Sequence, residues 1–285
     1  MSTQSIYKSE RGAAEIMALY DTVLARWPVP CDHLHVPTRH GDTFVIASGA
    51  PTAPPLVLLH GTASNSATWM GEIAAYSRRY RVCCVDIPGE PGKSSRERFA
   101  WDGPAFAEWI DDLCDGLQLT RTVLGGMSLG AWATIKYALY RPERVTAAVL
   151  ISPPGIAPPR ATFMLRMLGY SLLGDWGRQQ LIRSIFNGAE MPDDVIRFMT
   201  LVDRHFRYRL GAPPLYTDAE LASLHMPLLY LAGVDDVMLD TPKSAARLRR
   251  LAPNLTVQIS GADGHAVVNN AAAVMAFLDE QLVLV

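Results

Sequence analysis

Short apolar segments alternate with helical segments over most of this chain, and this alternation limits the possible folds more than any other feature. The run Leu56–Leu59 contains no polar residue, as expected for a strand that is buried on both faces of a parallel sheet. Alternating strands and helices predict an α/β fold, in which a mostly parallel, open sheet is covered by helices on both faces. The expected strands are 56–59, 80–85, 122–124, 145–151, 228–232 and 255–259, and the expected helices are 104–117, 129–140, 242–251 and 266–282.

The N-terminal part of the chain predicts an antiparallel edge for this sheet. Apolar residues at helical spacing indicate a helix over Ala13–Trp27, which Pro28 would end. Two segments of alternating polarity, His33–Thr38 and Thr43–Ala47, lie on either side of a glycine turn. We therefore expect a hairpin that makes one edge of the parallel sheet antiparallel.

One long segment interrupts the alternation of strands and helices. Between Ser152 and His225, no pattern predicts a strand, whereas four stretches predict helices. We expect residues 153–225 to form an all-helical insertion in an α/β core made of residues 1–152 and 226–285. The helices expected in the insertion are 162–173, 176–186, 192–208 and 217–224.

The insertion is rich in methionine and aromatic residues, among them Phe163, Met167 and Phe206. We expect most of these side chains to pack within the insertion and against the core. Methionine and aromatic side chains also form deformable pocket walls, so a contribution to a ligand pocket is an open alternative.

Composition excludes several classes of function. The length of 285 residues suits one large α/β domain, with or without an insertion. A formal net charge of −2 gives no electrostatic reason to expect a nucleic acid or an anionic membrane as partner. The polar segment Met1–Arg11 lacks the apolar stretch of a signal peptide, and no run of about 18 apolar residues occurs in the chain. We expect a cytoplasmic protein.

The four cysteines are Cys31, Cys83, Cys84 and Cys114, and none belongs to a C-x-x-C pair. This spacing gives no zinc-site pattern, and we expect buried, reduced thiols in a reducing compartment. Cys83 and Cys84 are neighbours in an expected strand, so their side chains should point to opposite faces of the sheet. We expect neither a metal nor a cofactor.

A G-x-S-x-G pattern, Gly126 to Gly130, lies between an expected strand and an expected helix. The pattern alone is compatible with an ordinary junction of small residues. A strand–turn–helix context is, however, what a nucleophile elbow requires, since it exposes a serine hydroxyl at the carboxyl end of the sheet. Ser128 is therefore the candidate nucleophile.

A serine needs a base, and the base needs an acid that orients it. His265 follows the last expected strand, and a loop histidine at that position is well placed to act as the base. Asp235 and Asp236 follow the preceding strand, and either could be the acid. The chain order of serine, aspartate and histidine is the order expected on this sheet architecture.

Acyl transfer also needs hydrogen-bond donors for the tetrahedral oxyanion. The backbone N–H of Leu129, directly after the candidate nucleophile, is one expected donor. The N–H of Thr62, in the loop after the strand Leu56–Leu59, is the other. His60 begins that loop, and we expect its imidazole to hold the loop in place rather than to take part in catalysis.

The chain resembles the α/β-hydrolase superfamily over nearly its whole length. The resemblance is carried by the stretches 58–61 (Leu-Leu-His-Gly), 86–94 (Asp-Ile-Pro-Gly-Glu-Pro-Gly-Lys-Ser), 126–130, 233–236 (Gly-Val-Asp-Asp) and 264–265 (Gly-His). In this superfamily the acid usually stands three positions after the strand-ending glycine, which implies Asp236. The resemblance also implies that the helical insertion is a cap over the pocket. The stretches 27–30 (Trp-Pro-Val-Pro) and 36–38 (Val-Pro-Thr) resemble a carboxylesterase-like bacterial subgroup.

The expected function is a serine hydrolase that cleaves small-molecule carboxylic esters through an acyl-enzyme. Serine at the elbow argues against the aspartate-nucleophile members of the superfamily, such as haloalkane dehalogenases. Thioesterase, lactonase, amidase, carbon–carbon bond hydrolase and perhydrolase activities use the same machinery and stay open. A ligand-binding member of the fold with an inert triad is the alternative from another class. The sequence predicts no oligomeric state.

Overall fold

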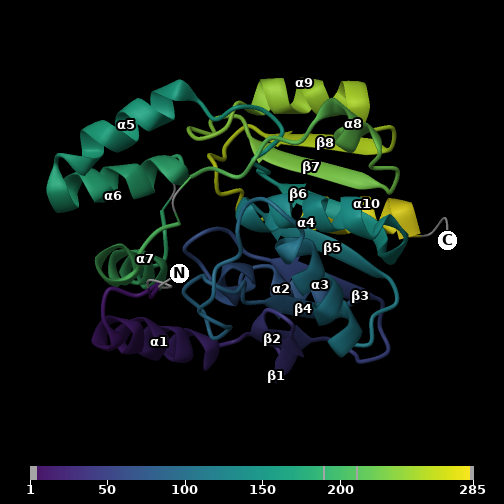
Figure 1. The fold of residues 1–285 in the computed structure, drawn as a ribbon, viewed down its shortest axis with the longest axis horizontal. Coiled ribbons are helices and arrows are strands. Elements are labelled where there is room, and N and C mark those ends of the chain that lie inside the picture. Colours follow the sequence, from purple (N-terminus) through teal and green to yellow (C-terminus); the bar gives the residue numbers. More distant parts are fainter. Residues whose placement is uncertain (1–4, 189, 210, 283–285) are drawn as a thin grey trace.

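The computed structural model of the chain describes residues 5–188, 190–209 and 211–282. Its centre is an eight-stranded sheet in the order β1-β2-β4-β3-β5-β6-β7-β8 (Figure 1). β1 pairs with β2, and β2 with β4, in antiparallel fashion, and the other neighbouring pairs are parallel. The predicted fold class, including the antiparallel hairpin at one edge, is confirmed. The strands are β1 (Cys31–Thr38), β2 (Gly41–Ser48), β3 (Pro55–Leu59), β4 (Arg81–Val85), β5 (Thr122–Met127), β6 (Val145–Ile151), β7 (Leu228–Gly233) and β8 (Leu255–Ser260).

The central strand β5 runs three residues further than the sequence predicts, because it includes Gly125 and Gly126. Glycine has a poor intrinsic preference for strands. Here both glycines pair with β3, opposite Leu58 and Leu59, and also with β6 on the other side. Ladder hydrogen bonds on two sides override the local preference and carry β5 up to the residue before Ser128.

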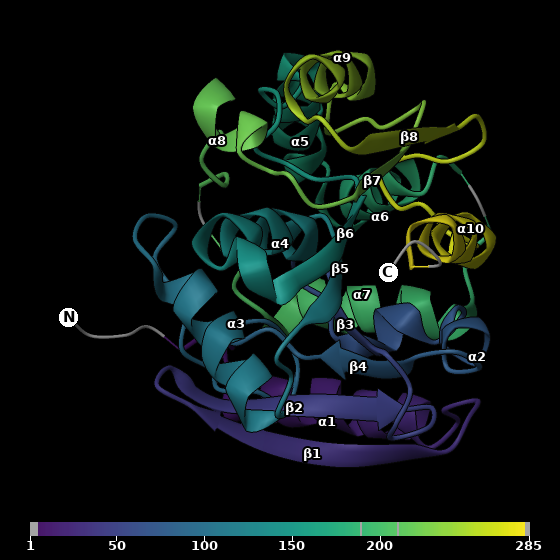
Figure 2. The same cartoon turned by 90° about the vertical axis from the view of Figure 1, so that its right-hand side faces the viewer.

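Helices cover both faces of the sheet, and Figure 2 shows α3 and α4 on the side opposite α2 and α10. One apolar core contains side chains of α3, α4 and α9, and a second contains side chains of α1, α2 and α10. Each face of the sheet is therefore sealed by its own helical layer. The helices outside the insertion are α1 (Glu10–Leu24), α2 (Ile73–Tyr76), α3 (Ala105–Gly116), α4 (Leu129–Tyr140), α9 (Thr241–Leu251) and α10 (Ala271–Leu282), with short 3₁₀ turns η1 (Ser66–Trp69) and η2 (Pro142–Arg144).

The cysteines follow this two-sided arrangement. Cys83 lies in the core under α3 and α4, and Cys84 lies in the core on the opposite face, as strand alternation predicts. All four cysteines are free thiols, and Cys114 is also buried. The expectation of burial is wrong for Cys31, which is only partly buried because it begins the edge strand β1.

Between β6 and β7, the described residues form the helices α5 (Ala161–Ser171), α6 (Gly174–Ile185), α7 (Asp193–His205) and α8 (Asp218–Ala222). Figure 1 shows α5, α6 and α7 on one side of the molecule, beyond the ends of the strands, and α8 close to α9. Within the described part of residues 153–225 the backbone forms no named strand, and its one β contact is an isolated bridge.

That bridge explains an error in the predicted helix 192–208. α7 ends at His205, because Phe206 turns to extended backbone and pairs with Tyr7. Phe206 is fully buried in a small core shared with α1, and Phe163 is also buried. Met167 is 39% exposed and is therefore an exception to the prediction that most methionine and aromatic side chains of the insertion are packed.

The last helix begins later than the sequence predicts, at Ala271 rather than Ala266. Asn269 has a left-handed φ of 55°, which prevents a continuous helix, and the carbonyl of Asn270 accepts the first helical hydrogen bond from Val274. The loop that carries His265 is thereby kept out of the helix. In the part of the chain that the structure describes, every helix is too short or too polar to cross a membrane.

Candidate active site

Ser128 lies at a sharp turn between β5 and α4. Its φ of 50° and ψ of −113° are strained for a residue with a side chain. Gly126 and Gly130 make this turn possible. A Cβ at Gly126 would lie 2.2 Å from the backbone carbon of Gly130, and a Cβ at Gly130 would lie 2.1 Å from the carbonyl oxygen of Leu59. The glycines therefore allow the strand and helix to approach, and the turn presents the serine hydroxyl.

Three residues that are far apart in the sequence meet at this turn. His265 Nε2 lies 3.0 Å from Ser128 Oγ, and His265 Nδ1 lies 2.8 Å from Asp236 Oδ2. His265 is 7% exposed and Asp236 is 1% exposed, so water has little access to the contact between them. The arrangement can take a proton from the serine at one ring nitrogen while the carboxylate holds the other.

The two neighbouring aspartates have different partners. Asp236 Oδ1 accepts hydrogen bonds from the backbone N–H groups of Met238 and Leu239, at 2.8 and 2.9 Å. These bonds aim its second oxygen at the imidazole of His265. Asp235 instead accepts a hydrogen bond from the side chain of Asn187, and its carboxylate faces the inserted helices. The structure therefore brings Asp236, and not Asp235, to the histidine.

The expected oxyanion donors lie beside the serine. Leu129 is the first residue of α4, and N–H groups in the first turn of a helix have no partner within the helix. The loop after β3 lies against the elbow, because the N–H of Gly130 donates to the carbonyl of His60, and a Cβ at Gly61 would lie 3.6 Å from Ser128 Cβ. Thr62 follows Gly61 in this loop, so both residues with an expected donor are next to residues of the elbow, and the binding of an oxyanion by their N–H groups stays a prediction.

Comparison with known proteins agrees with this geometry. A family model described as the alpha/beta hydrolase fold matches residues 54–191. Uncharacterized carboxylesterase nap of Bacillus subtilis (strain 168) is 33% identical over 255 residues, which cover 86% of this chain and 84% of the relative. The chain belongs to the α/β-hydrolase family. Carboxylesterase YbfK of the same strain is 34% identical over 263 residues, with 86% of each chain covered.

Solved structures extend the similarity past the end of the matched family model. The crystal structure of naproxen esterase (carboxylesterase NP) from Bacillus subtilis matches this α/β hydrolase with a TM-score of 0.84 at 30% identity. Carboxylesterase CesB (YbfK) from the same organism matches with a TM-score of 0.83, also at 30% identity. Each comparison covers 94% of this chain and 98% of the other chain, so the inserted region also has a structural counterpart in these relatives.

His60 has the structural role in this α/β hydrolase that the sequence predicts. It is fully buried, and its Nε2 accepts a hydrogen bond from the N–H of Ile87 at 2.9 Å. Its Nδ1 lies 2.8 Å from the carbonyl oxygen of Gly61 and must therefore carry the proton. Burial lowers the pKa of this imidazole, which favours the neutral tautomer that both bonds require.

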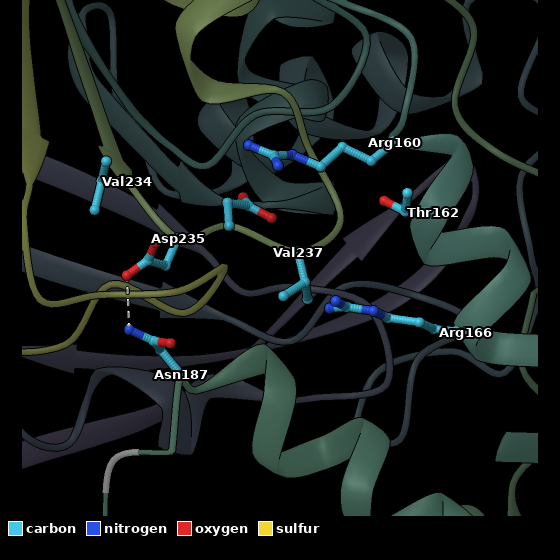
Figure 3. A pocket seen from close by; sticks show the side chains of 8 residues that line it. Arg160, Thr162, Arg166, Asn187, Val234, Asp235 and Val237 are labelled. Carbon is cyan, nitrogen blue, oxygen red and sulfur yellow. Dashed lines mark hydrogen bonds between the residues drawn. The ribbon is translucent and has the colours of Figure 1, made fainter.

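A pocket of about 400 Å³ lies between α5 and the loop after β7 (Figure 3). Arg160 and Arg166 point into it from the side of α5, opposite Asp235 and Asn187. Its lining includes Asp235 and Asp236 but neither Ser128 nor His265, so it adjoins the group of three residues from the side of the Asp236 carboxylate. The sequence does not predict this pocket, because its lining combines residues of the segment 160–187 with residues 234–237, which lie far away in the chain.

Metal-binding geometry is absent from the described residues, where no three His, Cys, Asp or Glu side chains are grouped to hold an ion. The expectation that the protein uses neither a metal nor a cofactor stays a prediction.

Proposed function

We propose that this α/β hydrolase is a serine carboxylesterase that acts on small-molecule esters, with Ser128, His265 and Asp236 as its catalytic triad. The observation that carries the proposal is the contact of His265 with both other residues, at 3.0 Å and 2.8 Å. The carboxylesterase relatives, at 33% and 34% identity over most of the chain, support the same reaction class.

The proposed reaction has two steps. Ser128 Oγ attacks the ester carbonyl while His265 Nε2 takes its proton, and the backbone N–H groups of Leu129 and Thr62 stabilise the oxyanion. His265 then gives the proton to the departing alcohol, which leaves an acyl-enzyme. Water, activated by the same histidine, releases the carboxylic acid. Asp236 holds the imidazole in the required tautomer and stabilises its protonated form.

The proposed domain organisation follows from the position of the inserted helices. We infer that residues 153–225 are a cap over the pocket, and that residues 1–152 and 226–285 form the core. A contact between the end of α6 and the histidine loop supports this division, because the N–H of Ala266 donates to the carbonyl of Ile185. The first four and last three residues of the proposed core, and residues 189 and 210 of the proposed cap, lie outside the described part of the chain.

The test is hydrolysis of p-nitrophenyl acetate and butyrate by the wild type and by Ser128→Ala. We expect the variant to lose activity about 10³-fold or more, since only binding and the oxyanion donors would remain. Equal rates for the two proteins would contradict the proposal. Tight binding of a ligand without turnover would instead favour the ligand-binding alternative.

The finer substrate class needs a panel of esters, thioesters and lactones, because related activities share the same machinery. We propose carboxylic esters as the preferred class. The cytoplasmic location also stays a prediction, which fractionation of cells that express the protein would test.

A further inference from the structure

Two loops at the carboxyl end of the sheet are joined by four hydrogen-bonded contacts. The first loop follows β3 and carries the proposed oxyanion donor Thr62. The second follows β4 and contains the stretch 86–95. The contacts join His60 to Ile87, Ala63 to Glu90, Asn65 to Pro91 and Ser66 to Asp86. The position of the first loop therefore depends on the second.

Two of these side chains hold the backbone on either side of Thr62. The imidazole of His60 bonds the carbonyl of Gly61, which belongs to the same peptide unit as the Thr62 N–H. Glu90 Oε2 accepts a hydrogen bond of 2.7 Å from the N–H of Ala63, in the next peptide unit. Ala63 has a left-handed φ of 58°, a conformation that costs energy for alanine. The hydrogen bond that the Ala63 N–H donates to Glu90 offsets this cost and orients the peptide between Thr62 and Ala63.

Burial of the Glu90 carboxyl group at this position is energetically unfavourable. It is 1% exposed, and burial raises its pKa to about 7. Its second oxygen, Oε1, faces Arg209 Nε at 3.9 Å, which is an ion pair but not a hydrogen bond. Arg209 comes from the segment after α7, and its guanidinium lies 4.6 Å from the ring centre of Trp101. Burial of an apolar side chain here would carry a smaller desolvation penalty, so stability alone does not account for the carboxylate.

We propose that Glu90 is a positioning residue for ester hydrolysis, which fixes the Ala63 amide and so keeps the Thr62 N–H aimed at the oxyanion. Arg209 provides the opposite charge from the chain that leaves the inserted helices. This inference rests on the proposed function. It assigns Glu90 no contact with the substrate and no proton transfer.

Three substitutions separate the hydrogen bond from the charge. Glu90→Gln keeps an acceptor for the Ala63 N–H, and Glu90→Met keeps the length of the side chain without a comparable acceptor. Glu90→Asp keeps the charge but withdraws the acceptor by one methylene. We expect kcat within about 3-fold of wild type for the glutamine variant, and about 10- to 100-fold lower for the other two, with KM changed little.

The Ki of an inhibitor that forms a tetrahedral adduct distinguishes a positioning role from a purely structural one, because a purely structural role would leave this Ki unchanged. A trifluoromethyl ketone forms an oxyanion adduct with the serine, so its Ki should rise in parallel with the loss of kcat. Asp111→Asn is the matched control, because Asp111 of α3 is a buried acid that pairs with Arg144 of η2, away from the elbow. We expect the folded control variant to keep the wild-type kcat and Ki.

Thermal melting establishes which variants fold. If Glu90→Met does not fold, the comparison of Glu90→Asp with Glu90→Gln tests the proposal. The proposal is overturned if the folded variants without a well-placed acceptor match Glu90→Gln in kcat and Ki, or if their loss lies in KM alone. Failure of the proposed function is a separate result, because it would appear as equal ester turnover by the wild type and Ser128→Ala.

Discussion

His265 contacts Ser128 and Asp236 through different ring nitrogens, and these contacts give each residue a separate task. The nitrogen at Ser128 must be unprotonated to accept the hydroxyl proton, so the nitrogen at Asp236 carries the hydrogen. Asp235, the neighbour of the acid, bonds to Asn187 and does not touch the histidine. Of the two adjacent aspartates, one therefore belongs to the proposed triad and the other contacts the inserted helices.

The division predicts unequal effects of two matched substitutions. Asp236→Asn should lower kcat about 10³- to 10⁴-fold, because an amide at this position favours the wrong tautomer of His265. Asp235→Asn should lower kcat by less than about 5-fold, since only an exposed hydrogen bond changes. Steady-state kinetics on p-nitrophenyl butyrate would measure both, and similar losses in the two variants would contradict the assignment.

The raised pKa of Glu90 predicts that the free energy of unfolding depends on pH. Its pKa is raised by burial from 4.5 to about 7, although Arg209 and Arg98 act in the opposite direction. A carboxyl with a raised pKa is favourable to folding when protonated, and this contribution is lost as pH rises through about 7. The gain in unfolding free energy from Glu90→Gln should therefore be larger at pH 8.5 than at pH 5.5, by roughly 2 kcal/mol. Urea unfolding at both pH values measures it, and an equal effect would refute the prediction.

The strand-to-helix elbow is the element whose geometry controls the proposed nucleophile. The close approach of Gly130 to Leu59 joins the start of α4 to the end of β3, so Ser128 and the loop that carries the proposed oxyanion donor Thr62 are held against each other. The sequence predicts this element well, since the G-x-S-x-G pattern requires small residues for a backbone reason. It predicts the start of α10 poorly, because the left-handed backbone at Asn269 leaves no pattern in the helical periodicity.

The elbow predicts opposite effects of the same substitution at two helical glycines. Gly130→Ala should cost about 3 kcal/mol or more, because the new methyl group would meet the backbone oxygen of Leu59 at 2.1 Å. Gly169→Ala in α5 is the control, since outside its own helix backbone and its chain neighbours no atom lies within 4 Å of the added Cβ, and alanine favours a helix by about 0.5–1 kcal/mol. Chemical denaturation gives both values. Equal destabilisation by the two changes would argue against the tight elbow.

The whole molecule brings together groups that the sequence separates widely. Ser128 and His265 are 137 residues apart, and each follows a different parallel strand whose carboxyl end lies at the same edge of the sheet. Apolar periodicity locates these strands along the chain, and parallel strands end at the same edge of a sheet, so this meeting is predictable from the sequence, whereas the order of the strands in the sheet is not. The contact of Glu90 with Ala63 is not, since it joins two irregular loops and depends on side-chain directions that no periodicity encodes.

Covalent labelling by a fluorophosphonate tests the central claim most directly, because the probe reacts with an activated serine in the folded protein. We predict one adduct per chain, located at Ser128 by peptide mapping, with labelling abolished by His265→Ala and by unfolding. A folded wild-type protein that hydrolyses esters but carries the adduct elsewhere, or that carries none at Ser128, would contradict the account.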